Sequence, residues 1–121
     1  MPQINDYFTA PLKNVHVHWG NRPNYQRNPY EAYIKIDMPT ARRLQLLKTG
    51  PDYLVEGQSF YVFPGGSQGA CHEYGKNLES RGDLTLLGHY LIDELHAQVG
   101  DTIRVTWVTA TSVRITLECT N

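Results

Sequence analysis

Two alternating segments near the C-terminus constrain the fold most. Apolar and polar residues alternate from Thr102 to Val108 and again from Ser112 to Leu117, with a short turn between the two runs. A period of two is typical of half-buried strands, so this pair predicts a β-hairpin. Its core-facing side chains are predicted to be Ile103, Val105, Trp107, Val113, Ile115 and Leu117.

The rest of the chain contains more short strands and two short helices. Strands are predicted at residues 15–19, 31–37, 53–56, 59–63 and near 83–87. Pro39 and the stop signal Gly50-Pro51 delimit a helix over residues 39–48, and a second short helix is predicted near 89–97. We therefore expect a mostly β chain with two short helices, folded as an open seven-stranded pseudobarrel.

Length and composition indicate one domain and no membrane segment. The chain has 121 residues, 40% of them hydrophobic, which is ordinary for one globular domain. Residues 1–14, with two prolines, are predicted to be an N-terminal arm, and residues 15–121 a single domain. The start of the chain lacks an apolar signal segment, and no apolar run has membrane-spanning length, so a cytoplasmic location is expected. Cys71 and Cys119 have neither metal-type nor redox-type spacing.

Two polar loops are the best candidates for a functional site. The first polar loop runs from Trp19 to Tyr30, and the second from Gly66 to Arg81. Arginine forks match guanine edges, Asn and Gln amides match adenine edges, and lysine suits phosphates. The candidate DNA-binding residues are Arg22, Asn24, Tyr25, Gln26, Arg27, Gln68, His72, Tyr74, Lys76, Asn77 and Arg81. A protein that bound nucleic acid by bulk charge alone would usually be more basic than this chain, whose net charge is −1.

Four short motifs carry a resemblance to a known family. They are Tyr33–Pro39 before the first helix, His72–Lys76 in the second loop, Gly82–Leu87, and Gly100-Asp101. With the order of elements, they resemble the DNA-binding pseudobarrel of plant B3-type domains, most closely the effector-binding domain of EcoRII-type restriction endonucleases. The resemblance implies that both polar loops enter the major groove of double-stranded DNA. It leaves two alternatives open. The chain is either a free-standing DNA-binding protein or the non-catalytic recognition domain of a restriction enzyme, whose nuclease domain is linked or separate.

Two other functions stay open at this point. His16 and His18 point to the same side of a predicted strand and, with His72, resemble the metal ligands of a cupin, although the acidic ligand of the first cupin motif is replaced by Arg22 or Pro23. A protein-interaction module, such as a phage or host-defence factor, is the other alternative. The sequence indicates no catalytic residues and no cofactor, because no serine lies in a nucleophile or phosphate-binding motif.

Overall fold

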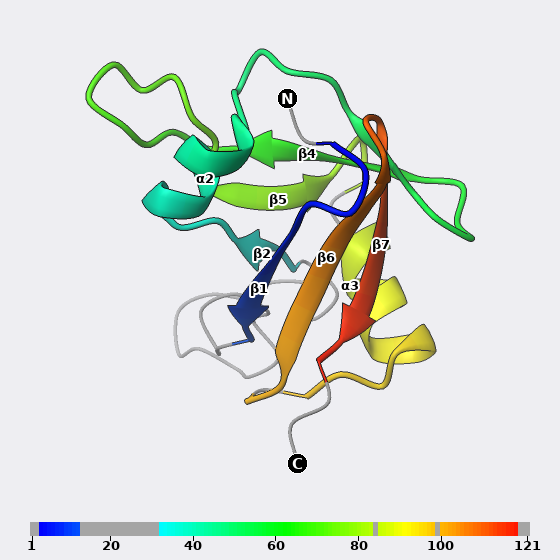
Figure 1. Cartoon of the computed structure of the whole chain (residues 1–121). Helices are drawn as coiled ribbons and strands as arrows, with labels where there is room; N and C mark the ends of the chain where they lie inside the picture. Colours follow the sequence, from blue (N-terminus) through cyan, green and yellow to red (C-terminus); the bar gives the residue numbers. More distant parts are fainter. Residues whose placement is uncertain (1–2, 13–31, 84, 99, 119–121) are drawn as a thin grey trace.

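One curled sheet of seven strands dominates the structure. The computed structural model describes residues 3–12, 32–83, 85–98 and 100–118. The strand order is β1-β6-β7-β3-β4-β5-β2, and the two edge strands, β1 and β2, approach each other without pairing in the sheet (Figure 1). The predicted open, seven-stranded pseudobarrel with two short helices is therefore confirmed, although the strand predicted at 15–19 lies outside the described residues.

The predicted C-terminal hairpin is present, and its strands are the second and third in the sheet. It consists of β6 (Thr102–Thr109) and β7 (Ser112–Leu117), which pair antiparallel with an irregularity between Trp107 and Thr109. Every predicted core residue of the hairpin is fully buried except Leu117, which is partly buried. The Trp107 ring packs edge-on against Tyr53, with 5.4 Å between ring centroids, so this tryptophan anchors the core.

The segment predicted as an N-terminal arm contains an edge strand. Strand β1 (Tyr7–Pro11) pairs antiparallel with β6 along its whole length. Phe8 and Ala10 are buried while Tyr7 and Thr9 are exposed, which is the alternation of a strand with one core face. Pro11 ends the strand at the sheet edge, where a missing N–H disrupts no ladder. Residues 7–11 of the predicted arm therefore pair with the sheet.

The helix and the strands between residues 34 and 65 follow the predictions closely. Strand β2 (Ile34–Lys35) leads into helix α2 (Met38–Leu44), and strands β3 (Tyr53–Val55) and β4 (Tyr61–Gly65) follow. The Asp37 side chain caps α2 by accepting a hydrogen bond of 2.9 Å from the Thr40 N–H. The helix ends four residues earlier than predicted because Gln45 adopts a left-handed conformation, with φ of 55°.

Two predictions between residues 77 and 97 were wrong. Strand β5 (Asn77–Ser80) lies within the segment predicted as a loop, and its antiparallel pairing with β4 buries Leu78. The strand predicted near 83–87 is replaced by helix α3 (Leu86–His89), which continues into a π-helical turn, η1 (Tyr90–Glu94). Leu87 and Leu91 are spaced as on one face of a helix, and both side chains are fully buried, which favours the helix over the predicted strand. None of the described helices is both long and apolar enough to cross a bilayer.

Candidate nucleic-acid interface

The first polar loop cannot be placed in the fold. Its five candidate residues, Arg22, Asn24, Tyr25, Gln26 and Arg27, belong to segment 13–31, outside the described residues. His16 and His18 of the cupin-like alternative belong to the same segment. That the two polar loops stand on one side of the sheet therefore stays a prediction.

Residues 66–76 of the second polar loop form a narrow hairpin, here called the ribbon, which one bridge between Gln68 and Tyr74 closes and which is bonded to the residues after helix α2. Gln68 and Tyr74 exchange main-chain hydrogen bonds of 2.9 and 3.2 Å across the ribbon. Tyr74 also forms a β-bridge with Leu47, and the Lys48 N–H donates to the Glu73 carbonyl at 3.0 Å. These bonds make the ribbon and the residues after α2 one unit, so groups on both can contact the same ligand.

Gln68, predicted to read a base edge, forms two hydrogen bonds that hold the ribbon in place. Its Nε2 atom donates to the Ile36 carbonyl at 2.9 Å and to the Gly75 carbonyl at 2.8 Å. Both amide hydrogens are thereby used inside the chain, since a glutamine amide carries two donors. Gln68 links β2 to the returning side of the ribbon.

Three further candidates of the second loop are also engaged within the chain. Tyr74 packs against the core, and the Asn77 amide donates to the Glu79 carboxylate at 3.3 Å. Arg81 forms a two-pronged ion pair with Asp52, at 3.1 and 2.7 Å, and its guanidinium carbon lies 3.8 Å from the centroid of the Phe63 ring. Hydrogen bonding to Asp52 raises the pKa of Arg81, so the arginine stays charged but already has a carboxylate partner.

Among the candidates that the structure describes, His72 and Lys76 are exposed and are not held by a side-chain hydrogen bond or ion pair. His72 stands at the tip of the ribbon in a left-handed conformation, with φ of 55°. The stem of Lys76 passes so close to Gly66 that a Cβ atom there would lie 2.6 Å from Lys76 Cγ. Glycine therefore gives the lysine stem its path over the main chain and leaves the side chain at the surface.

Five basic residues lie on β2, on α2 and the residues after it, and on the ribbon, and the sequence analysis selected only Lys76 among them. In the described part of the chain, the Lys and Arg side chains without a carboxylate partner are Lys35, Arg42, Arg43, Lys48 and Lys76, here called the basic face. The other described arginines, Arg81, Arg104 and Arg114, pair with Asp52, Glu118 and Glu56. The sequence contains a signal for part of the basic face, because Asp37 is the only acidic residue between Lys35 and Pro51.

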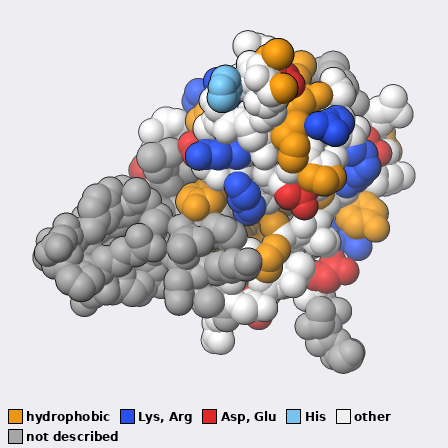
Figure 2. Space-filling model, turned by 90° about the vertical axis from the view of Figure 1, so that its left-hand side faces the viewer, with side chains coloured by type: hydrophobic (Ala, Val, Ile, Leu, Met, Phe, Trp, Pro, Cys, Tyr) orange, Lys and Arg blue, Asp and Glu red, His pale blue; other side chains and the backbone are white. Residues whose placement is uncertain are grey.

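The basic face is continuous with the second polar loop. Lys48 Nζ donates to Ser67 Oγ at 2.7 Å, which joins the end of α2 to the base of the ribbon. Helix α2 and the ribbon lie on the same side in Figure 1, and Figure 2 shows Lys and Arg side chains spread over that side. None of these cations forms an ion pair within the described chain, although Asp37 lies near Arg43 and Lys35, so they can interact with an anionic ligand.

A shallow hollow of about 340 Å³ lies beside the basic face, between β1 and α2. Arg43 forms one wall, and its Nη2 atom donates to the Tyr7 carbonyl at 2.8 Å, which fixes the guanidinium over the sheet edge. Asp37 lines the same hollow, and hydrogen bonds from Thr40 lower the pKa of its carboxyl group. The hollow thus combines a positioned arginine with an ionised helix cap.

No group of His, Cys, Asp and Glu side chains suited to holding a metal ion occurs among the described residues. His72 is the single cupin-like candidate within that part of the chain, and it lies at an exposed ribbon tip.

Comparisons with protein-family models, with curated proteins and with solved structures return no match. The resemblance to B3-type domains therefore depends on the sequence motifs and the order of elements described above.

Proposed function

We propose that this chain is a sequence-preferring module that binds double-stranded DNA in the major groove. The observation that carries the proposal is a projecting ribbon with two cations that have no carboxylate partner, Lys76 on the ribbon and Lys48 hydrogen-bonded to its base at Ser67. The major groove of B-DNA admits a two-stranded β-ribbon, and Lys and Arg side chains beside such a ribbon would meet phosphates. The module would act in the cytoplasm, either alone or with a linked or separate nuclease domain.

Within this proposal the contacts divide into two kinds. Lys48, Arg42 and Lys76 would contact phosphates, which positions the module without selecting a sequence. His72 at the ribbon tip would reach base edges, together with Arg27 and the amides of the first polar loop. Gln68 and Arg81, which are engaged with other parts of the chain, would act on the interface by supporting its shape.

Near-zero net charge is compatible with this proposal. Three arginines are neutralised by carboxylates elsewhere on the described surface, whereas the basic face lacks such partners. A local field of this kind attracts polyanions even when the sum over the chain is −1.

The test is duplex binding measured as a function of salt. A preferred site would first be selected from random duplex DNA, and affinity then measured by fluorescence anisotropy at several salt concentrations. The logarithm of affinity should fall with the logarithm of salt, with a slope of about −0.9 for each phosphate contacted. Absence of binding at low salt, or a flat salt dependence, would refute the proposal.

Variants locate the interface. Lys48→Ala and Arg42→Ala should each weaken binding to all sequences and make the slope shallower by about 1. Arg114→Ala is the matched control, because it removes the same charge from an arginine that is paired with Glu56. An effect of Arg114→Ala equal to that of Lys48→Ala would contradict the assignment of the basic face.

A further inference from the structure

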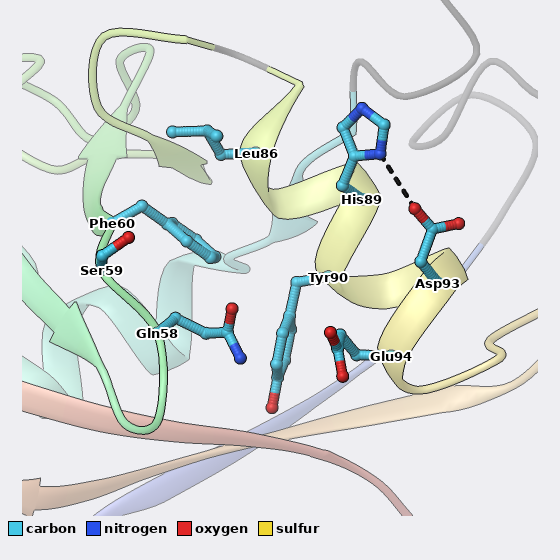
Figure 3. A pocket seen from close by; sticks show the side chains of 8 residues that line it. All are labelled: Gln58, Ser59, Phe60, Leu86, His89, Tyr90, Asp93 and Glu94. Atoms are coloured by element: carbon cyan, nitrogen blue, oxygen red, sulfur yellow. Dashed lines mark hydrogen bonds and ion pairs between the residues drawn. The ribbon is translucent and has the colours of Figure 1, made fainter.

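A second hollow, of about 250 Å³, lies between the β3–β4 turn and the segment formed by α3 and η1 (Figure 3). Gln58 and Phe60 line it from the turn, and Tyr90 and Glu94 line it from η1. In Figure 3 the Gln58 amide and the Glu94 carboxylate flank the Tyr90 ring on either side. Segments about thirty positions apart in the sequence thus form one open, partly aromatic depression.

The aromatic wall of this hollow is held rigidly. The Tyr90 hydroxyl donates to the Ile115 carbonyl at 2.9 Å, and the Phe60 and Tyr90 rings meet edge to face, with 6.2 Å between centroids. Tyr90 begins the π-helical turn η1. Such turns are rare in proteins and are frequently found at functional sites, where the extra residue redirects side chains.

The charge at the hollow is negative and only partly compensated. Asp93 pairs with His89 at 3.0 Å, and nearby Glu56 pairs with Arg114 at 3.0 Å. Glu94 has no ionic partner among the described residues. Burial raises the pKa of Tyr90, and the carboxylates of Glu94 and Glu56 raise it further, which is consistent with a negative local potential.

We propose that this hollow binds the guanidinium group of an arginine side chain. A guanidinium is planar and stacks on aromatic rings, while its N–H fork pairs with a carboxylate. Tyr90, backed by the largely buried Phe60, supplies the ring, and Glu94, which lies beside that ring, supplies the unpaired carboxylate; Gln58 lies on the other side of the ring (Figure 3). The hollow and helix α2 lie on opposite sides of the molecule in Figure 1, so this site is independent of the proposed DNA interface.

The test uses the full chain and a matched pair of small probes. Acetyl-arginine amide carries the guanidinium, and acetyl-citrulline amide has the same shape with a neutral urea. Titration monitored by backbone amide NMR should give saturable shifts at Gln58, Tyr90 and Glu94 with the arginine probe. The citrulline probe should bind about tenfold more weakly, because it loses the charge that the carboxylate recognises. A peptide of neutral residues that contains one arginine is then compared with the free amide. Tighter binding of the peptide indicates a partner protein as the ligand, and equal binding indicates a small guanidinium compound.

Two variants make the test specific. Glu94→Gln preserves the shape of the hollow and should weaken the arginine probe about two- to fivefold, as expected for the loss of an exposed ion pair. Glu118→Gln removes the carboxylate that pairs with Arg104, and it should leave the affinity unchanged. The proposal would be overturned by equal binding of the two probes, by equal effects of the two variants, or by shifts that avoid the hollow. None of these outcomes depends on whether the chain binds DNA.

Discussion

Replacing Gln68 by methionine tests whether this residue reads DNA or supports the ribbon. Methionine is similar in length but has no donor, so the carbonyls of Ile36 and Gly75 lose hydrogen bonds of 2.9 and 2.8 Å. Each neutral hydrogen bond contributes about 0.5–1.5 kcal/mol net, and the apolar thioether recovers part of the loss in this partly buried position. We therefore expect the free energy of unfolding to fall by about 1–2 kcal/mol.

The assay is urea unfolding followed by tryptophan fluorescence, since Trp107 is fully buried in the core. With a urea dependence of about 2 kcal/mol per molar, the midpoint should fall by about 0.5–1 M. Gln98→Met is the matched control at an exposed position whose side chain makes no hydrogen bond within the described chain, and it should not shift the midpoint. An unchanged midpoint for Gln68→Met, together with an altered DNA sequence preference, would refute the supporting role and restore direct base reading.

Three further perturbations follow from the packing and the charges. Asp37→Ala should lower the free energy of unfolding by about 0.5–2 kcal/mol at neutral pH by removing the α2 cap. Because hydrogen bonding from Thr40 lowers the pKa of Asp37 in the folded state, the capping contribution is fully present above the unfolded carboxyl pKa of about 3.9. It is lost as the pH falls through the lowered value, so wild type and variant should converge in acid unfolding curves. Trp107→Phe should cost less than the roughly 3–5 kcal/mol expected for Trp107→Ala, because phenylalanine keeps a buried ring and the part that is lost includes an Nε1 atom with no partner in the described chain. Equal losses of the two variants in urea unfolding would contradict this. Arg81→Ala should cost less than about 1 kcal/mol, since its pair with Asp52 is largely exposed, and a loss of duplex affinity matching that of Lys48→Ala would contradict its exclusion from the basic face.

The candidate site was only partly predictable from sequence. The polar character of segment 66–81 identified a projecting loop, and His72 and Lys76 are exposed as that interpretation requires. The same polarity could not separate side chains that face solvent from those that bind the chain itself. Gln68 and Arg81 belong to the second group, because their partners, Ile36 and Asp52, are about thirty positions away.

The sequence by itself determined the elements whose signal is local. The alternation of β6 and β7 gives one buried and one exposed face whatever the strands pair with, and Pro39 with the Asp37 cap defines the start of α2 without any distant contact. Tertiary structure decided the rest. Strand β1 exists because β6 supplies its hydrogen-bond partners, and β5 exists because β4 supplies the partners of a polar segment. The basic face likewise arises only when main-chain bonds dock the ribbon on the residues after α2, because side chains far apart in the sequence share a surface only after the sheet has curled.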